Sequence, residues 1–180
     1  KNGAGKTVLL RLLCGLMHPS KGQVIVDGKQ LGKDVDFAPD AGIIIETPCF
    51  LPYLSGFQNL KELASIRNII SKEEIAEAME QVKLDPASRK HVGKYSLGMR
   101  QRLGIAQAIM ERPRYLILDE PMNGLDTQGM EDVRELLQKQ KETGVTVILA
   151  SHSMEDIRLL CDTVHRIQDA SLIPCTTEFS

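Results

Sequence analysis

The sequence predicts an α/β fold in which a mostly parallel sheet is flanked by helices. Three apolar runs, at 42–45, 115–118 and 145–150, have the composition of strands that are buried on both faces. Helical patterns lie between these runs, and such alternation is typical of parallel sheets. Each run leads into polar residues, so we expect polar side chains to gather at the carboxyl edge of the sheet.

The composition narrows the class of protein. The chain has 180 residues, the size of one domain, and its 42% apolar and 26% charged residues are ordinary for a soluble globular protein. A net charge of −2 argues against a nucleic-acid-binding surface. No apolar run is long enough to span a bilayer and no targeting segment opens the chain, so we expect any membrane role to depend on a partner. Cysteines 14, 49, 161 and 175 form no C-x-x-C pair, which favours reduced cytosolic thiols over zinc ligands or disulfides.

The first seven residues, KNGAGKT, match the closing half of the phosphate-binding pattern G-x-x-x-x-G-K-[ST]. Gly3 and Gly5 can adopt positive φ and turn backbone amides around a phosphate. Lys6 adds a positive charge for the β- and γ-phosphates, and Thr7 offers a hydroxyl to Mg²⁺. The alternative is a glycine-rich turn that precedes a helix, since short patterns also occur by chance.

The first third of the chain alternates short elements with loops. A helical pattern covers 8–17 and stops at the breaker sequence of 18–22. We expect a short strand at 23–26 with a turn at 27–28, a loop over 29–40, and then the strand at 42–45. That strand ends at Glu46, whose carboxylate is a site candidate. The proline-rich stretch 47–53 predicts an irregular segment that packs against other structure.

A small helical insert follows. Helices are predicted at 57–68 and from the capping box that begins at Ser71, with Ile75, Met79 and Val82 on one face. Another helix begins after Ser96 and ends at Pro113. By itself Ser96 is best interpreted as the N-cap of this helix.

Asp119 and Glu120 directly follow the apolar run 115–118. Adjacent carboxylates at the end of a buried strand are costly unless they face a cation or a polar cleft, so we expect Asp119 to bind Mg²⁺ rather than to form a solvated acidic turn. Asp126 is expected to cap a helix that ends at 143–144. His152 follows the run 145–150 at the same edge, where the sequence leaves a structural and a catalytic role equally open.

Taken together, five motifs resemble the ATP-binding subunits of ABC transporters. Residues 2–7 are similar to Walker A, 95–99 to the signature, 116–121 to Walker B, 124–126 to the D-loop and 151–152 to the switch histidine. The stretches 42–60 and 95–108 more narrowly resemble the bacitracin and lantibiotic resistance transporters. The resemblance implies a P-loop NTPase fold in one domain, 1–180, with a small helical subdomain at about 50–110 that carries the ABC signature.

The same resemblance implies that the protein is an ATPase that couples hydrolysis to export of an antimicrobial peptide, with ATP and Mg²⁺ as cofactors. A transmembrane permease and a second ATPase subunit in a head-to-tail dimer would be its partners. Membrane contact would be made only through the permease, at the cytoplasmic face of a bacterial membrane. Two alternatives remain: a soluble ABC-type ATPase acting in translation or DNA repair, and an inactive remnant that only binds a partner.

The resemblance also assigns roles. Glu120 would orient or deprotonate the attacking water, and His152 and Lys6 would stabilise charge on the phosphates. Thr7, Asp119 and Glu46 would lie at the metal, Glu46 also near the attacking water. The nucleotide would contact Asn2, Gly3, Ala4, Gly5, Lys6, Thr7 and Val8, with Ser96, Gly98 and Asp126 acting across the dimer.

Three departures from the family pattern stand out. Leu97 and Met99 replace a glycine and the glutamine of the usual signature, so only Ser96 and Gly98 carry over from it. Glu46 replaces a glutamine, and an ionised carboxylate cannot donate a hydrogen bond, so we hypothesise that Glu46 favours metal over phosphate. The first glycine of the phosphate-binding loop would stand before Lys1, and no strands are expected after residue 170. We therefore expect a chain that is shortened at both ends. Such a chain should bind ATP weakly and should expose apolar surface where a central strand would sit.

Overall fold

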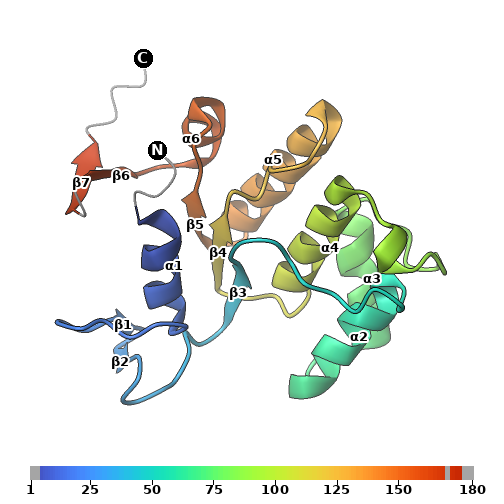
Figure 1. The fold of residues 1–180 in the computed structure, drawn as a ribbon, viewed down its shortest axis with the longest axis horizontal. Coiled ribbons are helices and arrows are strands. Elements are labelled where there is room, and N and C mark those ends of the chain that lie inside the picture. The colour runs from blue at the N-terminus through green and yellow to red at the C-terminus, as the bar shows by residue number, and fades with distance from the viewer. Residues whose placement is uncertain (1–4, 169–170, 176–180) are drawn as a thin grey trace.

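A parallel sheet of three strands forms the centre of the computed structural model, which describes residues 5–168 and 171–175. The strands are β3 (Ala41–Ile44), β4 (Tyr115–Asp119) and β5 (Thr146–Ala150), in the order β3-β4-β5. Both neighbouring pairs are parallel, with Ile43 opposite Ile117 and Ile117 opposite Ile148. The three apolar runs of the sequence are therefore the three central strands, and their carboxyl ends lie at one edge (Figure 1).

Helices cover both faces of this sheet because alternate strand residues point to opposite faces. Helix α1 (Lys6–Cys14) packs on one face, where Leu10 and Cys14 form a small core with Ile117. Leu116 and Leu118 point to the other face, into the main core under α4 (Leu97–Ile109) and α5 (Thr127–Glu142). The α/β fold with flanking helices is confirmed.

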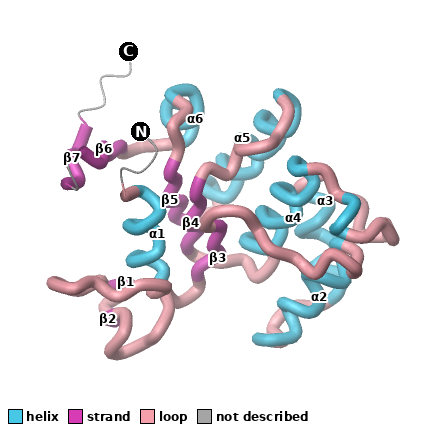
Figure 2. The backbone as a smooth tube through the Cα atoms, in the orientation of Figure 1, coloured by secondary structure: helices cyan, strands magenta, loops and turns pink. Residues whose placement is uncertain are grey.

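Helices α2 (Gly56–Arg67) and α3 (Lys72–Gln81) pack with α4 into a helical subdomain beside the sheet, and a 3₁₀ turn, η1 (Val92–Lys94), precedes α4 (Figure 2). Both α2 and α3 begin at a complete capping box, in which Ser55 pairs with Gln58 and Ser71 with Glu74. Ile75, Met79 and Val82 are buried as the sequence pattern predicts. The boundaries of this subdomain near 50 and 110 remain a prediction.

Several element ends differ from the expectation. Helix α1 ends at Cys14 rather than at residue 17, because Gly15 adopts a left-handed conformation, φ 83°, and its N–H closes the helix. Leu16 and Met17 are consequently exposed. The expected loop over 29–40 contains β2 (Lys29–Gln30), which pairs with β1 (Ile25–Val26) across the turn at 27–28. Helix α4 ends at Ile109, before Pro113 is reached.

The C-terminal part holds structure that the sequence reasoning missed. Helix α6 (Met154–Leu160) follows β5, and β6 (Val164–Gln168) pairs antiparallel with β7 (Ser171–Cys175). The expectation of no further strand after 170 is therefore wrong. These strands escaped notice because they are largely exposed and β7 contains Pro174, so neither shows the apolar run of a buried strand.

An apolar groove of about 590 Å³ follows the outer side of β5, between α1, α6, β6 and β7. Within the described ranges, β5 pairs only with β4. The groove is lined by apolar side chains that include Leu9, Leu13, Val147 and Leu149.

No helix in the described part of the chain is long and apolar enough to cross a bilayer. Cysteines 14, 49, 161 and 175 are free thiols in the structure.

Candidate functional site

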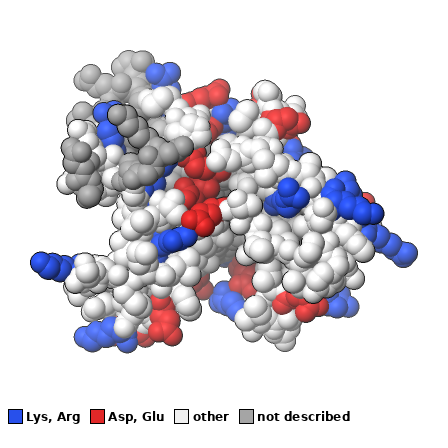
Figure 3. Space-filling model, in the orientation of Figure 1, with Lys and Arg blue, Asp and Glu red and all other residues white. Residues whose placement is uncertain are grey.

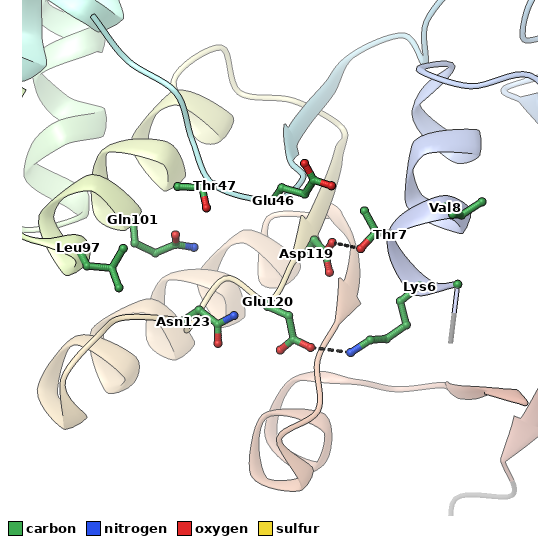
Figure 4. Close-up of a pocket in the computed structure, with 11 residues that line it drawn as sticks. Lys6, Thr7, Val8, Glu46, Thr47, Leu97, Gln101, Asp119, Glu120 and Asn123 are labelled. Atoms are coloured by element: carbon green, nitrogen blue, oxygen red, sulfur yellow. Dashed lines mark hydrogen bonds and ion pairs between the residues drawn. The ribbon is translucent and has the colours of Figure 1, made fainter. Parts of the chain in front are cut away.

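A pocket of about 490 Å³ opens at the carboxyl edge of the sheet, and the first turn of α1 forms one of its walls (Figure 4). Acidic side chains gather near the middle of the face drawn in Figure 3, beside this edge. The pocket is lined by Gly5, Lys6, Thr7, Val8, Glu46, Thr47, Leu97, Gln101, Asp119, Glu120 and Asn123. Four segments that are distant along the chain, 5–8, 46–47, 97–101 and 119–123, therefore meet at one edge of the sheet.

The first turn of α1 provides the anion-binding side of the pocket. Gly5 precedes the helix with φ 96°, a left-handed conformation that favours glycine. The first amides of any helix lack intrahelical acceptors and carry the positive end of the helix dipole, so they attract anions. Lys6 extends from the same turn into the pocket (Figure 4). Asn2, Gly3 and Ala4, the other expected loop contacts, lie outside the described residues.

Thr7 and Asp119 form the part of the site that suits a magnesium ion. The Thr7 hydroxyl donates to Asp119 Oδ2 at 2.6 Å, and Asp119 is only 8% exposed at the end of β4. Both supply hard oxygen ligands, and Mg²⁺ commonly binds one or two protein oxygens together with water and substrate phosphates. The described residues hold no cluster of three or more His, Cys, Asp or Glu side chains that could bind a metal alone. With one hydroxyl and one carboxylate, Thr7 and Asp119 fit an ion whose other ligands are water and substrate phosphates.

Glu120 lies between two cationic or hydrogen-bonding groups. Its Oε1 accepts from Lys6 Nζ at 2.6 Å, and its Oε2 lies 2.7 Å from Nδ1 of His152. Burial by itself raises the pKa of Glu120, but the hydrogen bonds and charges of Lys6 and His152 outweigh it and bring the pKa below its ordinary value. Glu120 is consequently ionised at neutral pH and can accept a proton.

Backbone geometry explains how two successive carboxylates reach one pocket. Successive side chains of a regular strand point to opposite faces, so Asp119 and Glu120 would normally diverge. Glu120 instead has φ 47°, a left-handed conformation that is uncommon for a residue with a side chain. This conformation allows both carboxylates to line the same pocket.

Glu46 also follows its strand with a positive φ, of 62°. Its carboxylate accepts from Arg11 Nη2 at 2.6 Å, and its side chain is 61% exposed. Arg11 lies one turn after Thr7 on α1 and was not singled out from the sequence. The structure thus places Glu46 at the pocket but pairs it with an arginine, and its part in metal binding stays a prediction.

The expected cross-dimer residues do not line the pocket of one chain. Ser96 caps α4 by accepting from the Met99 amide at 3.2 Å, and Asp126 caps α5 by accepting from the Gly129 amide at 2.8 Å. Gly98 lies against the backbone oxygen of Gly124. The N-cap interpretation of Ser96 and Asp126 is confirmed, while their action on a second subunit stays a prediction.

Sequence reasoning missed three polar residues of the pocket, Thr47, Gln101 and Asn123. Gln101 is 7% exposed and donates to the carbonyl of Pro121 at 3.0 Å, so it ties α4 to the turn that follows Glu120. Its spacing of four residues from Leu97 on one helix is the signal that could have found it, since both then lie on the same face.

Comparison with known proteins gives consistent matches. The family described as "ABC transporter" matches residues 1–123. An uncharacterized ABC transporter ATP-binding protein of Bacillus subtilis (strain 168), YybJ, is 46% identical over 161 residues, which are 89% of this chain and 74% of that protein. The bacitracin transport ATP-binding protein BcrA of Bacillus licheniformis is 41% identical over 96% of this chain and 57% of its own length. The lantibiotic transport ATP-binding protein SrtF of Streptococcus pyogenes is 34% identical over 96% of this chain and 74% of that protein.

Solved structures agree with the fold. A dimeric ATP-binding cassette in a post-hydrolysis state, bound to ADP and Pi, superposes with a TM-score of 0.83 over 96% of this chain and 80% of that chain, at 20% identity. The structure of cbiO1 from Clostridium perfringens, part of an ABC transporter complex, gives a TM-score of 0.78 at 27% identity, over 96% of this chain and 72% of that chain. The chain spans a little over half the length of several curated relatives, 56% and 57% in two Bacillus subtilis proteins.

Proposed function

The chain belongs to the ABC transporter family of ATP-binding proteins, and we propose that it is the ATP-hydrolysing subunit of an exporter that removes an antimicrobial peptide. One observation carries the catalytic part of this proposal. Three separate parts of the chain supply the set, and direct contacts of 2.6 to 2.7 Å join its members, Lys6, Thr7, Asp119, Glu120 and His152. Such a set of a lysine, two hard oxygen ligands, a carboxylate base and a histidine suits hydrolysis of a magnesium-bound triphosphate.

In the proposed mechanism, the first-turn amides of α1 and Lys6 Nζ bind the phosphates of ATP. Thr7 and Asp119 would hold Mg²⁺, and the ion would supply positive charge that neutralises the phosphates and polarises the phosphoryl group. Lys6 must exchange its contact with Glu120 for the phosphates, which leaves the Glu120 carboxylate free to orient a water molecule and accept its proton. The His152 imidazole then stabilises the charge that develops on the transferred phosphoryl oxygens.

Two partners complete this proposal. A second copy of the chain would contribute Ser96 and Gly98 to the phosphates, with Asp126 linking the two sites. Its support is that Ser96 and Gly98 do not line the pocket of their own chain, and that a cassette of the same fold bound to ADP and Pi is dimeric. A transmembrane permease would bring the ATPase to the cytoplasmic face of the bacterial membrane and contact the cargo.

The cargo is inferred from the named relatives. BcrA and SrtF are named as bacitracin and lantibiotic transport proteins, and both exceed 30% identity to this chain. An antimicrobial peptide is therefore the substrate class that we propose.

Replacing Lys6 with alanine in the complete protein, expressed together with its permease, tests this function. We expect Lys6→Ala to abolish Mg²⁺-dependent ATP hydrolysis and to remove resistance to bacitracin or a lantibiotic, because the phosphates lose their main cation. Lys29→Ala, in the exposed β2 hairpin, is the matched control and should leave both unchanged. Hydrolysis that survives Lys6→Ala would contradict the catalytic proposal, and copurification with ribosomes instead of a permease would contradict the transport role.

The acidic residue after β3 gives a second test. If Glu46 favours the metal, Glu46→Gln should raise the Mg²⁺ concentration needed for half-maximal hydrolysis several-fold, because one negative charge is removed near the ion. Titrating Mg²⁺ at saturating ATP measures this effect. Glu62→Gln, on the exposed side of α2, should leave the titration unchanged. Unchanged Mg²⁺ dependence and unchanged transport-coupled hydrolysis in Glu46→Gln would show that the hypothesis is wrong.

A further inference from the structure

The most deeply buried carboxylate among the residues that the structure describes has no part in the mechanism above. Asp156, in the first turn of α6, is 2% exposed. Its Oδ1 accepts from Nε and Nη2 of Arg134 on α5, at 2.8 and 2.6 Å. The Arg134 side chain is itself only 13% exposed. A planar guanidinium that donates twice to one carboxylate fixes the geometry of both groups.

Asp156 also organises the three residues that join β5 to α6. The Ser151 hydroxyl lies 3.4 Å from Asp156 Oδ2, and the Asp156 amide donates to the Ser153 hydroxyl at 3.2 Å. The Ser153 amide donates in turn to Ser151 Oγ at 3.0 Å. Both neighbours of His152 are therefore tied to one buried residue.

His152 needs such support because its own surroundings provide little. Its side chain is 68% exposed, yet its ring nitrogen lies 2.7 Å from Glu120 and its amide 3.4 Å from the same carboxylate. An exposed side chain has rotational freedom that packing does not remove, so the direction of the ring depends on the backbone that carries it. That backbone is fixed on both sides of His152 by the serines.

Stability alone is a weak reason for the Arg134–Asp156 pair. Removing two charges from water costs roughly as much as their attraction returns, and apolar residues of similar size often replace such a pair without loss. A second, more exposed pair, between Arg102 on α4 and Asp132 on α5 at 2.9 Å, already links α5 to its other neighbour. The buried pair is distinguished by its connection to the His152 loop.

We propose that Asp156, held by Arg134, is a positioning residue that fixes the loop of His152 so that the imidazole reaches Glu120 and the phosphoryl group. The proposal deepens the proposed function, since positioning matters to hydrolysis only if His152 takes part in it. Asp156 acts through His152 and does not touch the pocket itself.

The test is Asp156→Asn in the complete protein, observed first by NMR of ¹³C-labelled histidine rings. This chain has four histidines, at 18, 91, 152 and 165, and the spectrum of His152→Gln assigns the signal of His152. We expect Asp156→Asn to shift or broaden the His152 signal and to leave the other three in place. Asp132→Asn, which breaks the comparison pair on α5, should leave all four unchanged.

Hydrolysis gives the second readout. A misdirected His152 should lower kcat about tenfold, since small misplacements of catalytic groups have effects of at least that order. The KM for ATP should change less than about twofold, because Lys6 and the first turn of α1 are untouched and uniform binding is retained. Arg134→Lys keeps the charge but loses the double contact, so it should be intermediate in both readouts.

Two outcomes would overturn the proposal. One is a His152 signal that does not move in folded Asp156→Asn. The other is an equal change in the signals of all four histidines, because this would indicate that the Arg134–Asp156 pair is purely structural. If Asp156→Asn fails to fold, the same comparison with Arg134→Lys decides the matter. A wild-type protein that hydrolyses no ATP would refute the proposed function, while the NMR comparison would still decide whether Asp156 directs His152.

Discussion

Replacing Glu120 with glutamine is expected to reduce ATP turnover by at least about 100-fold, the scale of effect typical of a lost general base. The exchange keeps the size of the side chain but removes the charge that accepts a proton. ATP should remain bound at least as tightly, because Lys6 Nζ no longer has to leave an ion pair of 2.6 Å to reach the phosphates. Single-turnover hydrolysis and equilibrium binding of ATP in the complete protein measure the two effects separately.

A matched control exists for this exchange. Glu111 is another half-buried glutamate, with a side chain that is 18% exposed and pairs with Arg67 at 2.7 Å, and it is not among the residues that line the pocket. Glu111→Gln should therefore leave turnover within about twofold of the wild type, as expected of a substitution away from the site. Unchanged turnover in Glu120→Gln would remove Glu120 from its assigned role.

Much of this site could be predicted because its residues follow strands that are recognisable from sequence. The runs before Glu46, Glu120 and His152 are apolar and short, and parallel strands present their carboxyl ends at one edge. Lys6 and Thr7 were identifiable from the glycine spacing around them. That placement brings Lys6, Glu120 and His152 to one edge of the sheet, while the contact of Glu120 with Lys6 also depends on the backbone conformation of Glu120.

The remaining features depend on tertiary contacts that have no local signature. The pairing of Glu46 with Arg11 joins a loop to a helix 35 residues away, and the pair of Arg134 with Asp156 spans 22 residues. The left-handed backbone at Glu120 is also invisible in sequence, since glutamate rarely adopts it. The end of α1 at Gly15, by contrast, has a local signal, because glycine is the commonest residue just after a helix.

Tight packing at β3 leads to the largest expected effect on stability. Gly42 lies where α4 crosses the strand, and a Cβ at this position would collide with the Ala108 carbonyl oxygen and come within 2.9 Å of Leu116 Cδ2. The first of these atoms belongs to helix backbone and cannot rotate away. Gly42→Ala should therefore push α4 from the sheet and lower the free energy of unfolding by about 3 kcal/mol or more, at the upper end of overpacking effects.

Denaturant unfolding, followed by circular dichroism, measures this loss as a lower midpoint concentration. Gly22→Ala is the control, since its added Cβ meets no atom within 4 Å and only the positive φ of 80° is strained. That strain should cost only about 1 kcal/mol. An equal effect of the two exchanges would show that the approach of α4 to β3 is not the reason for glycine at 42. A larger effect at 42 would instead confirm that this contact holds the helix carrying Gln101 against the strand that leads to Glu46.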